Sequence, residues 1–181
     1  MSRSTVRHAI ADFLAAGVPA IPGLQQVFKA MPTLIDGALF NLIADGGSGA
    51  VAWLHLAISD ETRWTTPGPT PAIGMSGTKG VHYDVTVMVA YQYLLPSAST
   101  DPTVMPDDWV DSEDAILQGI KSRLQSDATC GTSGPGGSGV IWSAGQNPNG
   151  LTISPDEPVL EDGKVISWHE IGFRVTEVVQ A

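Results

Sequence analysis

The segment from Val81 to Pro96, VHYDVTVMVAYQYLLP, constrains the fold more than any other part of the chain. Its valines and tyrosines fall on alternate positions: Val81, Tyr83, Val85, Val87, Val89, Tyr91 and Tyr93. Because side chains alternate between the two faces of a strand, this spacing predicts one long strand with a buried Val/Tyr face. The other face carries His82, Asp84, Thr86, Met88, Ala90, Gln92 and Leu94, and it is more polar at its start than at its end.

Two further segments are also predicted to form long strands. Residues 50–64, AVAWLHLAISDETRW, are apolar on both faces, which is typical of a strand covered on both sides. Residues 164–179 alternate again, with one face formed by Val165, Ser167, His169, Ile171, Phe173 and Val175. The EDGK sequence before this last strand is a hairpin-turn signal. Residues 140–144 predict a short strand, and residues 151–160 an extended segment broken by proline.

Two segments have the periodicity of amphipathic helices. In residues 4–16 the apolar stripe consists of Val6, Ala9, Ile10, Phe13 and Leu14. A signal peptide is the alternative interpretation there, but Asp12 interrupts the apolar run and prolines follow closely. In residues 107–126 the stripe consists of Trp109, Ile116, Leu117, Ile120 and Leu124. Acidic residues crowd the first turns of this second helix, where they suit the helix dipole.

Glycine and proline separate these elements. The chain contains 20 Gly and 13 Pro, which predicts many turns and long loops. Residues 65–80 and 127–139 are expected to project as loops from a single domain spanning residues 1–181. Residues 18–32 contain three prolines and should be extended, whereas residues 34–44 fit a short helix or a strand. The pattern predicts an α+β fold: a mostly antiparallel, twisted sheet with two main helices packed on one face.

Charge and cysteine content narrow the function. The formal net charge of -10 argues against binding nucleic acid through a general phosphate-neutralising surface. Solubility is the simplest role for this charge, and an acidic docking face is the other. A single cysteine, Cys130, excludes an internal disulfide and favours a reducing compartment. No apolar run approaches the roughly 18 residues of a membrane span.

The sequence shows no recognisable set of catalytic or metal-binding groups. The histidines, His8, His55, His82 and His169, lack metal-ligand spacing and are interpreted as cross-strand or surface residues. No serine stands in a G-x-S-x-G motif. The GPGGSG stretch from Gly134 to Gly139 matches G-x-G-x-x-G, but a helix precedes it and a strand follows, the reverse of a dinucleotide site. Carboxylates at residues 107–114 and 156–162 lack calcium-loop spacing. We therefore expect no enzyme, no cofactor and no metal.

Other features favour a role in protein assembly. Long loops cost folding entropy, and they can order against a neighbouring subunit. Tryptophan is favoured at interfaces, although core packing explains at least some of the five in this chain: Trp53, Trp64, Trp109, Trp142 and Trp168.

The order of elements suggests a family. An N-terminal helix leads into IPGLQQVFKAMP, followed by two long strands, the acidic-capped helix DWVDSEDAILQGIKSRL and a C-terminal strand ending WHEIGFRVTEVV. Over nearly the whole chain this order resembles the tail terminator proteins of long-tailed bacteriophages. The resemblance implies an α+β fold, a hexameric ring, and no catalytic residues or cofactor.

The resemblance also implies partners and a location. The ring would sit on the last ring of the tail tube protein, stop tube growth and present a surface to the head connector protein. DNA would pass through its lumen without specific binding, and an acidic lining would repel the phosphates. The protein would be part of the virion, at the tail or neck, after assembly in the host cytoplasm, with no membrane contact.

A ring needs two different surfaces on each subunit. We expect one of them to involve residues 65–80 and the mixed face of the strand at 81–95. The candidate interface residues are Trp64, Pro67, Pro69, Met75, Lys79, His82, Asp84, Gly134 and Gly136. The alternatives are another neck or connector protein, a tail tube subunit or, in a different class, a small-ligand-binding domain or enzyme with a concave pocket.

Overall fold

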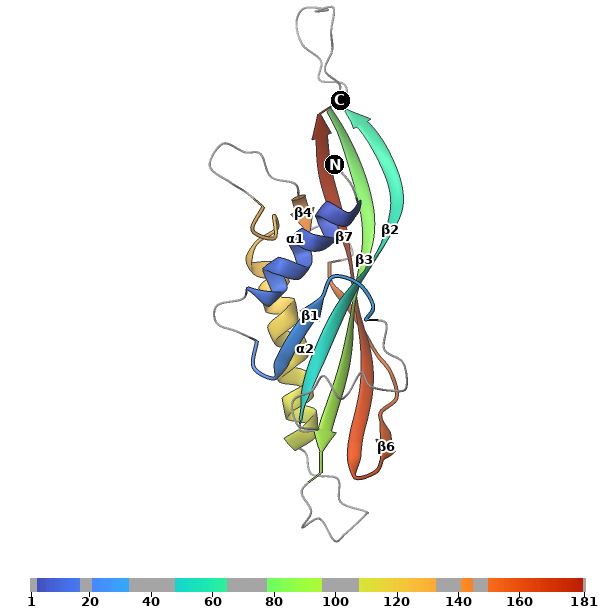
Figure 1. Ribbon diagram of the computed structural model, residues 1–181. Coiled ribbons are helices and arrows are strands. Elements are labelled where there is room, and N and C mark those ends of the chain that lie inside the picture. The colour runs from blue at the N-terminus through green and yellow to red at the C-terminus, as the bar shows by residue number, and fades with distance from the viewer. Residues whose placement is uncertain are drawn as a thin grey trace, which may run out of the picture.

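The computed structural model describes residues 3–16, 21–32, 48–64, 78–95, 108–132, 141–144 and 150–180. Two helices, α1 (Arg3–Ala15) and α2 (Asp108–Ser126), lie beside one seven-stranded sheet (Figure 1). The strands are β1 (Leu24–Phe28), β2 (Gly49–Trp64), β3 (Thr78–Leu94), β4 (Ile141–Ala144), β5 (Thr152–Pro155), β6 (Val159–Glu161) and β7 (Lys164–Gln180). The fold is α+β, as the sequence predicts.

Three long strands form the centre of the sheet. β3 pairs antiparallel with β2 on one side, from Thr78 to Gln92, and with β7 on the other, from Thr78 to Leu94. The strand order is β1-β2-β3-β7-β4, and β5 and β6 also pair with β7. Among the pairs of described strands, the β1–β2 pair alone is parallel. The sheet is therefore mostly antiparallel, and its first and last long strands lie on either side of β3.

The long strands twist strongly around one another. In Figure 1, β2 lies to the left of β7 at the bottom of the view and to its right at the top. A bulge between Ile58 and Asp60 interrupts the β2–β3 register. Bulges increase local twist and bend a strand, and β2 curves in its upper half. The bulge also exchanges the faces of β2, so that Asp60 pairs with His82 on the face away from the helices.

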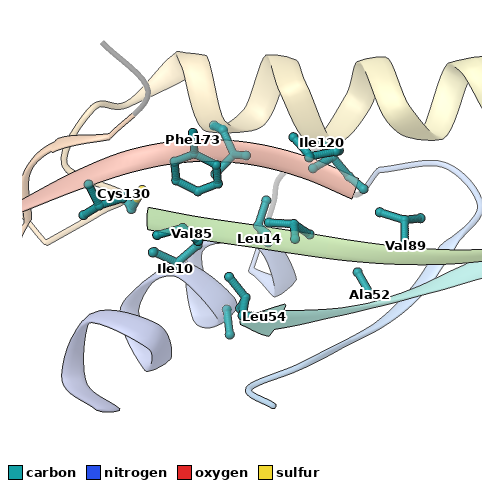
Figure 2. Close-up of a cluster of buried hydrophobic side chains, with 14 of the residues drawn as sticks. Ile10, Leu14, Ala52, Leu54, Val85, Val89, Ile120, Cys130 and Phe173 are labelled. Atoms are coloured by element: carbon teal, nitrogen blue, oxygen red, sulfur yellow. The ribbon is translucent and has the colours of Figure 1, made fainter. Parts of the chain in front are cut away.

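Both helices cover the Val/Tyr face of β3. Val85, Val87, Val89 and Tyr91 are each at most 1% exposed. Their core neighbours come from both helices and the flanking strands, including Ile10, Leu14, Leu54, Ile120 and Phe173 (Figure 2). The Val/Tyr face is therefore buried, as its alternation predicts, and residues of α1 and α2 share its core.

The two helices contact each other and the chain between α1 and β1. The Arg123 guanidinium stacks 4.0 Å from the centre of the Phe13 ring and donates a hydrogen bond to the Phe13 carbonyl. Gly119 allows a close approach, because a Cβ atom there would lie 2.6 Å from Cγ2 of Ile21. A glycine is therefore required at the point where α2 meets Ile21.

The opposite face of the sheet is divided. Ala90 and Gln92 are buried, and Ala90 packs with Val51 and Trp53. The Trp53 and Trp168 rings meet edge to face, with centroids 5.8 Å apart. This apolar patch covers part of the mixed face of β3, the face that is expected from the sequence to contact another subunit. The rest of the face is more accessible: His55, Asp84 and Glu170 are exposed, and His82 is half-buried.

Most element boundaries agree with the sequence, with a few differences. β3 begins at Thr78, so residues 78–80 extend the strand instead of ending the loop. Residues 127–132 form a turn whose Cys130 is buried against the core. The EDGK turn is present, with Asp162 and Gly163 at φ 49° and 74°, as a two-residue hairpin with positive φ at both positions requires. Residues 34–44 lie outside the described residues.

Replacement of Ile120 by alanine tests the shared core. Ile120 is fully buried, so the substitution should lower the free energy of unfolding by about 2–5 kcal/mol. Val110 lies on the same helix but is 38% exposed, and Val110→Ala should change the value by less than about 0.5 kcal/mol. Urea unfolding of both variants measures the difference. Equal effects would show that α2 is not docked as described.

Candidate functional site

Two of the candidate interface residues form cross-strand pairs on the polar end of the sheet. Asp84 accepts a hydrogen bond from Arg174 Nε at 3.1 Å. His82 Nδ1 lies 3.0 Å from Thr176 Oγ1, and its Nε2 lies 3.6 Å from Asp60 Oδ1. Both residues therefore have partners, which sequence spacing did not reveal. Pairs of this kind stabilise adjacent strands by small amounts, and nothing in their geometry indicates catalysis.

The other candidate interface residues are only partly placed. Trp64 and Lys79 lie at the paired ends of β2 and β3, where Trp64 pairs with Thr78 and Arg63 with Lys79. The remaining candidates, Pro67, Pro69, Met75, Gly134 and Gly136, lie outside the described residues. The structure thus brings Trp64, Lys79, His82 and Asp84 together along one end of the β2–β3 hairpin.

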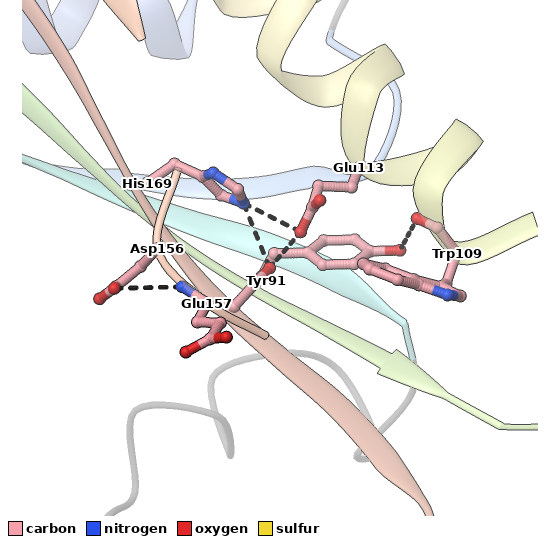
Figure 3. A network of polar contacts seen from close by, with 7 residues as sticks. Tyr91, Trp109, Glu113, Asp156, Glu157 and His169 are labelled. Atoms are coloured by element: carbon pink, nitrogen blue, oxygen red, sulfur yellow. Dashed lines mark hydrogen bonds and ion pairs between the residues drawn. The ribbon is translucent and has the colours of Figure 1, made fainter. Parts of the chain in front are cut away.

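A buried polar network links α2 to β7 (Figure 3). Glu113 Oε1 lies 2.9 Å from His169 Nε2 and accepts a hydrogen bond from the Ser167 hydroxyl. Ser167 Oγ also lies 3.2 Å from His169 Nε2. The three residues are at most 9% exposed. They form a polar connection inside an otherwise apolar interface.

This network contains the residue types of a hydrolytic triad but not its geometry. In a triad the histidine contacts the serine through one ring nitrogen and the carboxylate through the other. Here Nε2 of His169 contacts both, and Nδ1 is buried without a hydrogen-bond partner among the described residues. Ser167 is 1% exposed, so no substrate reaches its hydroxyl. The arrangement supports a structural role.

The sequence contains a signal for this network: polar residues at positions that the periodicity assigns to buried faces. Glu113 falls four residues after Trp109 and three before Ile116, within the apolar stripe of the helix. Ser167 and His169 likewise occupy the inward positions of the last strand. Polar residues on two buried faces must find partners. The periodicity does not predict that these residues pair with one another, because the helix and the strand are far apart in the sequence.

Two buried tyrosines of β3 donate hydrogen bonds to groups on neighbouring elements. Tyr91 donates to the Trp109 carbonyl at 3.1 Å, at the start of α2, and burial raises the pKa of its phenol to about 12. Tyr83 donates to Glu177 Oε2 at 2.8 Å. Burial, followed by the Glu177 carboxylate, raises the pKa of Tyr83 well above its ordinary value. Both phenols are therefore neutral hydrogen-bond donors at physiological pH.

Cys130 is a core residue instead of a reactive thiol. It is 2% exposed, with a backbone φ of 47°, and burial raises its pKa to about 12. The turn that holds it is organised by Asp127, which accepts hydrogen bonds from Thr129 and from the Gly131 amide. The hydrogen bond from the Thr129 side chain is the main cause that lowers the pKa of Asp127.

Within the described residues, the outer edge of β2 is paired over only a short part of its length. β1 pairs only with Ala50 to Trp53, and no other described strand pairs with this edge. The Arg3 side chain donates to the Leu56 carbonyl, which therefore points outward from the sheet. An unpaired edge of this kind is a template for a further strand unless it is protected.

A groove of about 390 Å³ lies beside this edge and reaches Thr86 and Met88 of β3 and Glu170 of β7. We call it the β2 groove; its lining includes Arg3, Arg7, Met31, Trp53, His55 and Glu170. Arg7 Nε is buried without a hydrogen-bond partner among the described residues, and Met31 is 74% exposed. The groove therefore combines two guanidinium groups with an accessible apolar side chain, a combination suited to an extended acidic and apolar segment.

Metal binding and membrane insertion find no support in the described part of the chain. Within it, no group of three or more His, Cys, Asp or Glu side chains is placed to hold a metal ion. Neither α1 nor α2, the two described helices, is both long and apolar enough to cross a membrane. His169 lies on the helix-covered face of the sheet, whereas His55 and His82 lie on the other, so the strand histidines do not converge.

Removal of the Glu113 carboxylate tests the buried network. Glu113→Ala should lower the free energy of unfolding by about 1–3 kcal/mol, because Ser167 and His169 lose their shared acceptor inside the core. Asp114 is exposed on the next position of α2, and Asp114→Ala should change stability by less than about 0.5 kcal/mol. Chemical denaturation compares the two. Equal stability would contradict a structural role for the network.

The buried phenols predict an alkaline limit to stability. A group whose pKa is raised on folding stabilises the fold fully below its unfolded pKa, which is 10.0 for tyrosine, and loses that contribution as the pH rises. Stability should therefore begin to fall above about pH 9, where unfolding releases the proton of Cys130, and fall further above about pH 10 as it releases those of Tyr83 and Tyr91. Tyr91→Phe should make this fall shallower in denaturation series between about pH 9 and 12. An unchanged slope would contradict the buried environment of Tyr91.

Comparison with known proteins gives no relative from which a function can be transferred. No protein-family model matches the chain, and no curated protein matches it.

Proposed function

We propose that this protein is a structural component of a bacteriophage virion: a tail terminator whose copies form a ring on the tail tube and join it to the head connector. The order of elements in the sequence resembles that family. The α+β fold, with two helices on one face of a largely antiparallel sheet, is the fold class that the resemblance implies. In this proposal the protein is not an enzyme, and it acts in the neck of the virion after assembly in the host cytoplasm.

The open edge of β2 is the observation that carries the proposal. β2 has 16 residues, and β1 covers only the first part of its outer edge. Long unpaired edges invite association, and monomeric proteins usually shorten, cover or charge them. Among the described residues, the Arg3 contact with the Leu56 carbonyl and the bulge between Ile58 and Asp60 are the protection of this edge. An edge of this length is expected in a protein that associates with other chains.

The polar contacts of the described side chains also favour a structural role. The buried Glu113–Ser167–His169 network is closed to substrate, and the surface pairs of His82 and Asp84 join neighbouring strands. These groups support a rigid scaffold for assembly. Acidic residues are in large excess in the sequence, and an acidic lumen would let DNA slide without sticking.

The oligomeric state tests this function. The purified protein should form one closed ring, with a mass near six copies of 19.0 kDa, by light scattering and negative-stain imaging. Added to growing tail tubes, it should cap their ends and stop elongation. The surface variant Val110→Ala serves as a control for the effects of substitution and purification, and it should form the same ring.

Two results would contradict the proposal. Polymerisation of the protein alone into long tubes would identify a tube subunit. A compact monomer that neither forms rings nor caps tubes would favour the small-ligand class, for which the β2 groove would be the pocket to examine.

A further inference from the structure

We infer that the β2 groove of one subunit binds the β5–β6 segment, residues 152–161, of a second copy of this chain. This inference rests on the proposed function, because a ring supplies a neighbouring copy in a fixed orientation. The inference goes beyond the proposed function by naming the two surfaces through which neighbouring subunits meet.

The groove side of the contact is basic and partly apolar. Arg3 and Arg7 project from the first turns of α1, and Arg7 Nε has no hydrogen-bond partner among the described residues. Glu170 is the acidic residue of the lining. Met31, 74% exposed, and Trp53 supply apolar surface. A ligand for this groove should therefore present carboxylates next to aliphatic side chains.

The β5–β6 segment has that composition. Val159 and Leu160 are neighbours in the chain and are 54% and 58% exposed, so they offer accessible apolar surface. Asp156, Glu157 and Glu161 flank them, and all three are exposed. The segment is held in an extended shape by pairing with β7 on one side, and no described strand pairs with its other side.

The two surfaces belong to opposite edges of one sheet. The groove lining comes mainly from α1, β2 and β3, with Glu170 of β7, whereas the β5–β6 segment pairs with the outer edge of β7. Contact between copies is therefore head to tail, with each subunit using a different surface toward each neighbour. A contact of this kind closes into a ring when its rotation allows and otherwise extends as a filament.

We expect side chains to make most of this contact, because the free edge of the segment cannot form a continuous series of backbone hydrogen bonds. Pro155 and Pro158 have no amide hydrogen and interrupt the free edge of the segment. Attraction between the arginines of the groove and the carboxylates of the segment would give the pairing its direction. Burial of Val159, Leu160 and Met31 would add apolar contact.

A charge exchange between the two surfaces tests the inference. The groove variant carries Arg3→Glu and Arg7→Glu, and the segment variant carries Asp156→Lys and Glu157→Lys. Each variant alone should weaken self-association by about tenfold or more, because like charges then face each other. Equimolar mixing should restore it, because each mutated groove can meet a mutated segment and each native groove a native one. Sedimentation velocity measures the association, and thermal unfolding verifies that both variants are folded.

Matched controls change the same charges elsewhere. Lys121→Glu alters a partly exposed lysine on α2, and Asp114→Lys an exposed aspartate on the same helix. Both should associate as the wild type does, which separates a local contact from an effect of net charge.

The outcomes distinguish this contact from the proposed function. Rings that form normally with both variants overturn the contact and leave the tail terminator proposal standing. Open filaments that both variants abolish and mixing restores support the contact and contradict a closed terminator ring. Failure of the mixture to recover, or a wild type that stays monomeric, overturns the contact.

Discussion

The pairing of β3 with a long strand on each side is the constraint on which the rest of this structure depends. Because β2 and β7 hold β3 along its whole length, every second side chain of β3 points to the same layer. That layer, formed by valines and tyrosines, is the surface on which both helices pack. A slip of one residue would send His82 and Asp84 into the core and the valines to the opposite face, so the apolar alternation fixes the register as well as the fold.

Polar groups are placed where they reinforce this packing. The Glu113–Ser167–His169 network ties α2 to β7, and the Tyr91 hydroxyl ties β3 to the first turn of the same helix (Figure 3). Hydrogen bonds inside a core add little net stability when satisfied, but they are costly when one partner is lost. Such contacts therefore select one position of the helix on the sheet. A scaffold that must present fixed surfaces to neighbouring chains benefits from that specificity.

The two edges of the sheet differ in a way that suits directional assembly. One edge ends in a basic groove beside an unpaired stretch of β2, and the other ends in short, acidic strands that carry exposed Val159 and Leu160. Both are produced by the same topology, since the chain places β1 along only part of β2 and uses three short strands to cover β7. The face of the sheet opposite the helices, by contrast, is partly filled by Val51, Trp53 and Ala90.

The sequence by itself determined the long strands, both helices, the Asp162–Gly163 turn and the buried face of β3, because these follow from local periodicity and turn chemistry. Only the tertiary structure decided which elements became neighbours. The partners of Glu113, the bulge after Ile58 and the open edge of β2 depend on contacts between residues distant in the chain. Periodicity reports which face of an element is buried, but it carries no information on which other element covers that face. The pairing of distant elements is set by the packing of the whole core.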